Sequence, residues 1–127
     1  MINENALDIK KEYLKKYKSL NLSINLIEKE IEILLNEEQK KGYRFSENSQ
    51  IFEKIILNLQ SLIKEKGDLL NSIEQGIESL ENETEKNILR LKYILGYSWE
   101  KISEIMDYSL RQIYNLHIKA LLNFPCP

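Results

Sequence analysis

The sequence has few of the residues that cross-link or interrupt a protein chain. Its 127 residues include one cysteine, one histidine, two prolines and four glycines. The single cysteine, Cys126, excludes an internal disulfide. With only one cysteine and one histidine, the sequence has no Cys and His ligand set for a metal site. The shortage of proline and glycine argues against a sheet with many turns. The abundance of Ile, Leu, Lys, Glu and Asn favours long helices, so we expect an all-α protein.

Long apolar runs are also missing. No window approaches the roughly 18 uninterrupted apolar residues of a membrane span. The first residues, MINENALDIKKEYLKKY, lack the apolar run of a secretory signal. No cysteine, serine or carboxylate is placed to work with His117 as a catalyst. We therefore expect a cytoplasmic protein with no membrane partner, no cofactor and no enzyme activity.

Apolar residues do recur in two long stripes that step by four and three positions, as in helices that pack along each other. The first stripe is Tyr13, Tyr17, Leu20, Ile24, Ile27, Ile31 and Leu34. The second stripe is Phe52, Ile56, Leu59, Ile63, Lys66, Leu70, Ile73, Ile77 and Leu80. Between them, residues 36–48 contain Gly42 and a polar run that predicts a turn, with Asn48 or Ser49 capping the next helix. Residues 1–81 are thus predicted to form an antiparallel helical hairpin, or coiled-coil arm.

Further apolar residues lie beside these stripes and exceed what a lone hairpin can cover. They are Ile9, Leu14, Leu35, Ile51, Ile55, Leu62 and Leu69. Two explanations are open: self-association through the arm, or packing against the C-terminal part of the chain. We expect a homodimer formed through the arm.

Capping residues divide the rest of the chain into three short helices. Asn82 with Glu85 predicts a capping box, and Gly96 is a suitable residue to end the helix that follows. Ser98 and Ser109 are predicted N-caps of the next two helices. Residues 82–127 therefore form a trihelical module, so the expected architecture is a long hairpin followed by this module.

The stretch from 98 to 119, SWEKISEIMDYSLRQIYNLHIK, has the spacing of a helix-turn-helix. In such a motif the apolar positions are buried where two helices cross steeply. Here those positions are Ile102, Met106, Tyr108, Ile113 and Leu116. Ser103 fills the position that requires a small residue. Asp107 occupies the turn position usually given to glycine, and Asp tolerates a left-handed backbone better than most residues.

The second helix of this motif, about residues 109–122, is predicted to enter the major groove of double-stranded DNA. Its candidate contact residues are Ser109, Leu110, Arg111, Gln112, Tyr114 and Asn115, with His117 and Lys119 placed to contact the backbone. Arg can bind guanine through two hydrogen bonds, and Gln or Asn can do so with adenine. Lys92 and Lys101 are candidate phosphate contacts. The lysine cluster at residues 10–18 is predicted to be mainly a solvated face.

Charge is modest and uneven. The net charge is −2; residues 1–81 carry 12 basic and 15 acidic residues, whereas residues 82–127 carry six and five. One copy can neutralise only a few phosphates, so its own affinity for DNA is expected to be weak. Dimerisation through the arm, or binding to a protein partner, would compensate for this weak affinity.

The segment LRLKYILGYSWEKISEIMDYSLRQIYNLHIKAL, residues 89–121, is similar to region 4 of bacterial sigma factors. It resembles still more the phage- and prophage-encoded regulators that carry such a module behind a helical arm. The matching residues are Leu91, Tyr93, Ile94, Gly96, Ser98, Trp99, Glu100, Ile102, Tyr108, Ser109, Arg111, Gln112, Ile113, Tyr114, His117, Ala120 and Leu121. The resemblance implies a phage or mobile-element transcription regulator in a bacterial host cell.

Three hypotheses follow from these patterns. The first is a dimeric, sequence-specific DNA-binding regulator. The second is a sigma-like factor that acts through RNA polymerase, with DNA contact secondary. The third is a coiled-coil adaptor that regulates another phage or plasmid machine through protein contacts.

Overall fold

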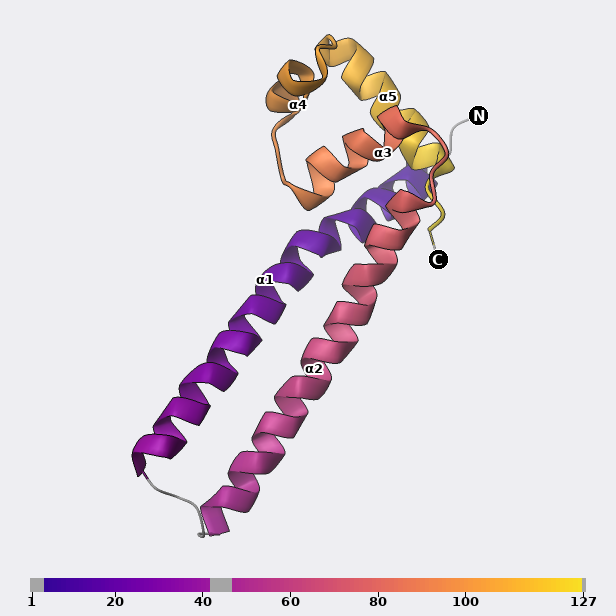
Figure 1. Cartoon of the computed structure of the whole chain (residues 1–127). Coiled ribbons are helices and arrows are strands. Elements are labelled where there is room, and N and C mark those ends of the chain that lie inside the picture. Colours follow the sequence, from indigo (N-terminus) through magenta and orange to yellow (C-terminus); the bar gives the residue numbers. More distant parts are fainter. Residues whose placement is uncertain (1–3, 42–46, 127) are drawn as a thin grey trace. The chain divides into compact units, whose positions relative to one another are not determined.

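The computed structural model describes residues 4–41 and 47–126, and within these ranges the chain is helical and contains no strand. The elements are α1 (Glu4–Lys41), α2 (Glu47–Glu78), α3 (Glu83–Leu89), the π-helical turn η1 (Arg90–Ile94), α4 (Trp99–Met106) and α5 (Leu110–Asn123) (Figure 1). The expected all-α class is confirmed. In the described ranges, no helix combines the length and the apolar character needed to cross a bilayer.

The described residues divide into two compact units. The core unit contains residues 4–19 and 70–126, and the two-helix unit contains residues 20–41 and 47–69. Each long helix contributes to both units. The sequence places a boundary after residue 81, whereas this structural division groups the start of α1 and the end of α2 with the C-terminal helices.

The core unit holds all the buried side chains found among the described residues. Its apolar members are Leu14, Tyr17, Ile73, Ile77, Leu80, Ile88, Leu89, Tyr93, Ile102, Ile113, Ala120, Leu121 and Phe124. Because these residues come from α1, α2 and the C-terminal elements alike, the core is shared. Fully buried Leu14 is one of the surplus apolar residues, and packing against the C-terminal module explains it.

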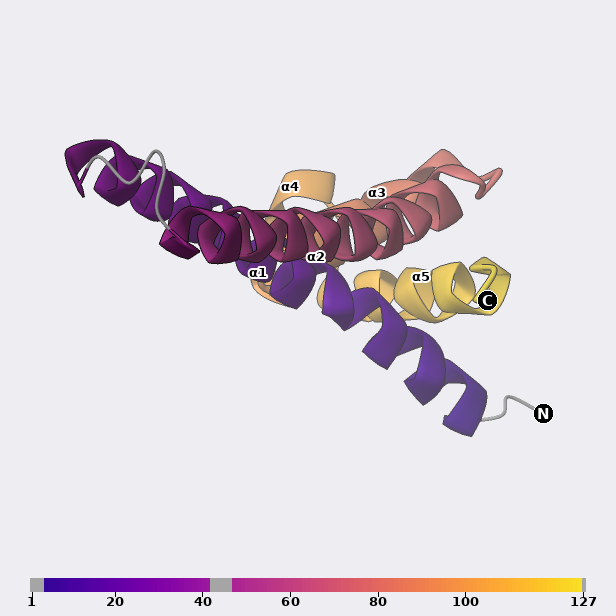
Figure 2. The same ribbon diagram turned by 90° about the horizontal axis from the view of Figure 1, so that it is seen from below.

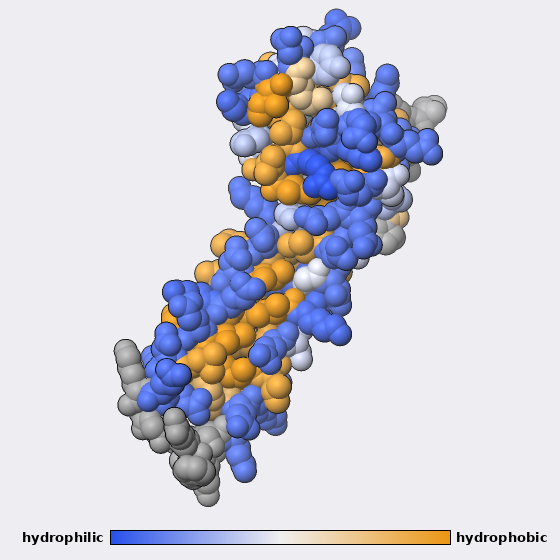
Figure 3. Space-filling view, viewed as in Figure 1, coloured by the Kyte–Doolittle hydropathy of each residue, from blue (hydrophilic) through white to orange (hydrophobic). Residues whose placement is uncertain are grey.

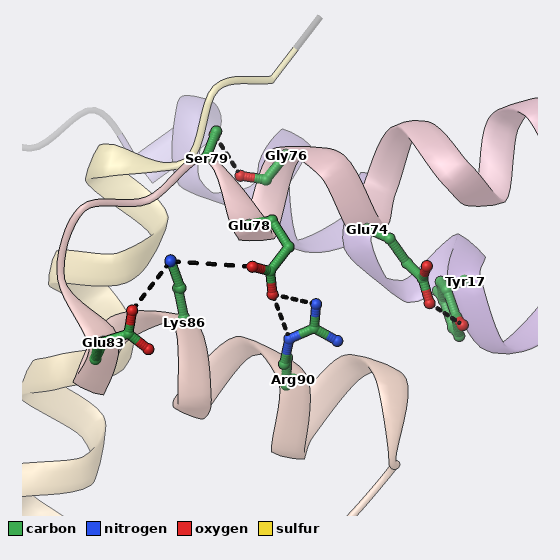
Figure 4. Close-up of polar contacts among 8 residues, drawn as sticks. All are labelled: Tyr17, Glu74, Gly76, Glu78, Ser79, Glu83, Lys86 and Arg90. Atoms are coloured by element: carbon green, nitrogen blue, oxygen red, sulfur yellow. Dashed lines mark hydrogen bonds and ion pairs between the residues drawn. The ribbon is translucent and has the colours of Figure 1, made fainter.

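Polar contacts reinforce this shared core at the end of α2 (Figure 4). The Tyr17 hydroxyl donates to a Glu74 carboxylate oxygen at 2.8 Å. Burial and this hydrogen bond raise the pKa of Tyr17 to about 12. Glu78 accepts from the Arg90 guanidinium, with Nε at 2.9 Å, and lies 4.0 Å from the Lys86 ammonium. The hydrogen bond from Arg90 holds the pKa of Glu78 below its ordinary value.

The first turns of α1 lie beside the end of α5 in both ribbon views (Figures 1 and 2). The Lys10 ammonium donates to the carbonyl oxygens of Leu121 at 2.8 Å and Leu122 at 3.2 Å. The Tyr13 ring meets the Phe124 ring at 5.9 Å between centroids. A cation on the last carbonyls of a helix satisfies acceptors that have no partner within the helix and opposes its dipole. The beginning of α1 therefore caps α5.

In the two-helix unit, α1 and α2 run antiparallel and side by side (Figure 1). The residues of the two stripes are half-buried here: Leu20, Ile24, Ile27, Ile31 and Leu34 on α1, and Phe52, Ile56, Leu59, Ile63 and Lys66 on α2. The stripe positions are therefore the less exposed side of each helix, as the spacing predicts. No side chain described in this unit is fully buried.

The predicted turn at residues 36–48 overlaps both long helices in the structure. Helix α1 continues to Lys41, and α2 already begins at Glu47, before the predicted caps Asn48 and Ser49. The polar residues 36–41 favour helix as well as turn, because Glu, Gln and Lys are good helix formers. The predicted turn residue Gly42 lies outside the described residues.

Large apolar side chains remain exposed on the two-helix unit. They are Leu22, Leu26, Ile33, Leu35, Ile51, Ile55, Leu57, Leu62 and Leu69. In the space-filling view of Figure 3, an apolar strip runs along the visible face of this unit. Five of the surplus residues predicted from the sequence are in this group, so packing on the C-terminal module does not explain them.

Candidate nucleic-acid interface

Helix α3 begins after the predicted cap Asn82, but only half of the predicted capping box forms. The Asn82 side chain accepts from the Glu85 backbone N–H at 3.0 Å, as predicted. The Glu85 carboxylate, however, accepts from the Asn123 side-chain amide at 2.7 Å. Glu85 is buried, with 7% of its surface exposed. Its carboxylate thus ties the start of α3 to the last residue of α5.

A π-helical turn links α3 to the segment before α4. The Leu95 N–H donates to the Arg90 carbonyl at 2.9 Å, and the Tyr97 N–H donates to the Leu91 carbonyl at 3.0 Å. Gly96 has φ 74°, a left-handed conformation that glycine adopts without steric cost. The predicted stop at Gly96 is confirmed, while nothing in the apolar spacing indicates the π-helical turn.

Helix α4 and the turn after it follow the sequence closely. Ser98 caps α4 by accepting from the Lys101 N–H at 3.1 Å. Asp107 has φ 57° and ψ 44°, the left-handed conformation expected of it. The Ser103 hydroxyl donates to the Tyr108 carbonyl, and the Tyr108 N–H donates to the Ser103 carbonyl at 3.2 Å. The small residue required at position 103 therefore also fastens the turn.

The crossing of α4 and α5 is held by apolar contacts. Ile102 and Ile113 are fully buried and cluster with Ile88 of α3. Met106 and Leu116 pack against this cluster and are partly buried. Four of the five predicted inner positions therefore lie in the core.

Tyr108 is the exception among these five positions. Its surface is 38% exposed. It lines an open depression of about 480 Å³ together with Leu95, Ile105 and other residues of α3, η1 and α4. The side chain lies at the edge of the core because the left-handed turn at Asp107 directs the chain outward before α5 begins.

Helix α5 begins with a complete capping box. The Ser109 side chain accepts from the Gln112 N–H at 3.1 Å, and the Gln112 side-chain oxygen accepts from the Ser109 N–H at 2.9 Å. These bonds satisfy two backbone donors at the start of the helix. The Gln112 oxygen is therefore occupied, and only its NH₂ group is directed to other partners while the box is formed.

Seven of the eight predicted contact residues are exposed on α5 or its cap. They are Ser109, Leu110, Arg111, Gln112, Tyr114, Asn115 and Lys119. Arg111 and Asn115 lie on the side of α5 opposite to the buried Ile113 and Ala120, and the other five residues lie at its sides or at its cap. This surface contains an arginine, two amides and a lysine but no carboxylate, so it offers hydrogen-bond donors and positive charge to a partner.

His117 does not belong to that surface. It is buried, with 6% exposed, and its Nε2 lies 2.7 Å from the Tyr93 hydroxyl. Its ring meets Trp99 edge-on at 4.6 Å. Burial first, and then the positive charges of Lys11 and Lys92, lower its pKa to about 4. The expected contact from His117 to a DNA backbone is therefore not supported, because the side chain is buried in the core and neutral.

Trp99 joins this core to the surface of α5. Its ring packs edge-on against Tyr114 at 5.7 Å, and the Lys92 ammonium lies 4.4 Å from the ring centroid. A cation over an indole face is an attractive arrangement. The sequence pattern does not predict this contact between Lys92 and Trp99.

Comparison with protein-family models, curated proteins and solved structures gives no match to this chain. Among the described residues there is also no cluster of His, Cys, Asp and Glu that could hold a metal ion. The interpretation of the α5 surface therefore depends on its own chemistry and on the sequence resemblance.

Proposed function

We propose that this protein is a sequence-specific, DNA-binding transcription regulator of phage or mobile-element type, acting in the cytoplasm of a bacterial host cell. Helices α4 and α5 would form a helix-turn-helix like that of sigma region 4. Helix α5 would enter the major groove of double-stranded DNA. The observation that carries the proposal is the exposed surface of α5, which contains an arginine, two amides and a lysine but no carboxylate, on a helix with a complete capping box.

Three features of this surface suit groove binding. The helix has 14 residues and begins at a left-handed turn fastened by Ser103. Arg111 and Asn115 are exposed one helical turn apart, and both have the donors and acceptors that match base edges. Ser109 and Lys119 flank them and suit phosphate oxygens.

We further propose that the protein acts as a homodimer formed through the two-helix unit. On α2 the exposed residues Ile51, Ile55, Leu62 and Leu69 step by four and seven, and so form a second apolar line beside the buried stripe. A helix with two apolar lines is typical of contact with more than one neighbour. Two copies would double the phosphate contacts and offset the weak charge of each.

Selection on random duplex DNA tests the proposal directly. We expect enrichment of an inverted repeat whose half-sites lie about one helical turn, roughly 34 Å, or a multiple of it apart. Arg111→Ala should weaken binding to the enriched duplex by about 1–3 kcal/mol and relax the preference for one base pair. Lys64→Ala, an exposed lysine of the two-helix unit, is the control and should bind like the parent.

The alternatives give different results in the same experiment. If binding to the selected site requires added RNA polymerase, the sigma-like hypothesis replaces the self-sufficient regulator. If no sequence is enriched and no duplex binds even at low salt, the adaptor hypothesis is favoured. If Arg111→Ala binds as tightly as the parent, the placement of α5 in the groove is wrong.

A further inference from the structure

We propose that Lys11, Lys18 and Lys92 form a second DNA-contacting surface, which binds the phosphates of the strand that borders the groove occupied by α5. This inference rests on the proposed function and extends it to α1. The sequence alone treats the lysines of residues 10–18 as a solvated face, because nothing in their spacing connects them to the C-terminal module.

The fold of the core unit brings these lysines together. The Lys18 ammonium lies beside Gly96, 3.9 Å from the position that a Cβ would occupy there. Gly96 directly precedes the segment that leads into α4. Lys92 lies over Trp99, the first residue of α4. Lys18 and Lys92 thus flank the start of α4 from two different elements.

Lys11 extends the same surface along α1. It lies one heptad before Lys18, so the two side chains point to the same side of the helix. After burial, the charges of Lys11 and Lys92 both lower the pKa of His117, so both lysines act on one side chain of α5. Leu14, between Lys11 and Lys18, is fully buried, whereas Lys11 is half-buried and Lys18 is exposed, so the two lysines lie at the edge of the side of α1 that packs in the core unit.

None of the three ammonium groups has a carboxylate partner among the described residues, and that of Lys92 lies over the Trp99 ring. Within the described ranges, none of them lies within 4.0 Å of a carboxylate oxygen, whereas their neighbours are engaged. Lys15 pairs with Glu12 at 3.4 Å, and Lys10 donates to carbonyls at the end of α5. Lys11, Lys18 and Lys92 are therefore among the described lysines that have no carboxylate partner, whereas Lys101 of α4 pairs with Glu104 at 3.6 Å.

This surface continues into the predicted groove-facing side of α5. Trp99 contacts Lys92 on one side and Tyr114 on the other. Tyr114 is exposed and belongs to the seven-residue surface. A DNA strand that follows the edge of the groove past Tyr114 would meet Lys92 and then Lys18. Phosphate contacts of this kind fix the position of a protein on the duplex without reading its sequence.

The three lysines also add positive charge to a module that carries little of its own. Arg111 and Lys119 are the only cations on the exposed surface of α5. Three more phosphate contacts would steepen the salt dependence of binding, since each contact contributes about 0.9 to the slope of log K against log salt concentration.

The test is a triple variant, Lys11→Gln, Lys18→Gln and Lys92→Gln, in the full chain. The probes are the selected duplex and a shuffled duplex of the same length and composition. We expect the salt slope to fall by about 2–3 and the affinity at 0.1 M salt to fall by about 10²-fold. The ratio of affinities for the two duplexes should stay that of the parent. Replacing the same lysines by arginine should preserve affinity and slope.

The matched control replaces Lys29, Lys54 and Lys64 of the two-helix unit by glutamine, with the same change in net charge. If both triple variants lose affinity equally, the effect is one of overall charge and the inference fails. It also fails if the Lys11, Lys18 and Lys92 variant keeps the parent slope while remaining folded by circular dichroism. Failure of the parent to bind any duplex would instead overturn the proposed function.

Discussion

The core unit and the two-helix unit are made from the same two long helices, yet they differ in how they cover apolar side chains. In the core unit, α1 and α2 are joined by three further helices, and residues such as Leu14 and Ile77 are fully inaccessible to solvent. In the two-helix unit, α1 and α2 pack against each other and no third helix of the unit covers them. A pair of helices buries one seam and leaves its flanks open, so a similar apolar content gives no buried residue there.

The difference teaches that apolar periodicity indicates which side of a helix faces inward but not how deeply it is buried. Ile27 and Ile77 are both members of the two apolar stripes. Ile77 is fully buried and lies in the core unit, where Phe124 packs against the neighbouring Gly76. Ile27 is half-exposed because only α2 covers it. Depth of burial depends on a third element, which is distant in the sequence.

The largest expected effect concerns the exposed apolar line of α2. Ile55→Glu combined with Leu62→Glu should raise the dissociation constant of the dimer by more than about 10³-fold. Each apolar side chain contributes roughly 2 kcal/mol when buried, and each dimer contains four of these sites. Sedimentation equilibrium measures the change. Leu57→Glu, at a residue that is more exposed in the parent and lies off this line, should leave the association constant unchanged.

The next effect tests the shared core. Ile113→Ala should lower the free energy of unfolding by about 2–5 kcal/mol, because the fully buried side chain would leave a cavity beside Ile88 and Ile102. Urea denaturation followed by circular dichroism gives the value. Ile33→Ala, in the two-helix unit, should cost less than about 1 kcal/mol in the monomer. Equal losses at the two sites would remove the contrast between the units.

A pH titration tests the buried position of His117. Its pKa is about 4 in the folded protein and 6.5 in the unfolded chain. Between these values the unfolded chain takes up a proton that the folded protein does not, so stability is full above pH 6.5 and falls as the pH approaches 4. The loss should reach about 3 kcal/mol. In His117→Gln, urea midpoints at pH 7 and pH 4.5 should differ by correspondingly less than in the parent.

The smallest effect concerns the hydrogen bond between α1 and α2 in the core unit. Tyr17→Phe removes the donor to Glu74 and should destabilise the protein by about 1 kcal/mol. The Glu74 carboxylate is only partly buried and can bind water instead. Ser61→Ala, an exposed site on α2, is a control that should have no measurable cost. A loss of several kcal/mol in Tyr17→Phe would mean that this contact organises the core unit rather than reinforcing it.

Much of the local structure follows from the sequence. The caps Asn82, Ser98 and Ser109, the left-handed turn at Asp107 and the stop at Gly96 are all predicted correctly. Each depends on hydrogen bonds or backbone angles within a few residues. Such interactions are encoded by neighbouring side chains, so they can be inferred without knowledge of the tertiary structure.

The features that the sequence does not predict involve contacts between distant segments. Burial of His117 depends on Tyr93 and Trp99, and the hydrogen bond from Asn123 to Glu85 replaces half of an expected capping box. The position of Lys18 beside Gly96 is another such contact. Helical spacing alone leads to the eight candidate contact residues, and seven of them are exposed. The eighth faces inward because the packing of η1 and α4 against α5 covers it.

The contact between Lys10 and the end of α5 has a consequence for the order in which the protein folds. It joins residues 111 positions apart, so it closes nearly the whole chain into one loop. Such closure is entropically costly and slow compared with forming a helix. On the ribosome, Lys10 is synthesised long before Leu121. The hydrogen bond between the start of α1 and the end of α5 therefore cannot form until α5 has been synthesised. Helix α5 would therefore gain its final anchor only after the rest of the core unit has been synthesised.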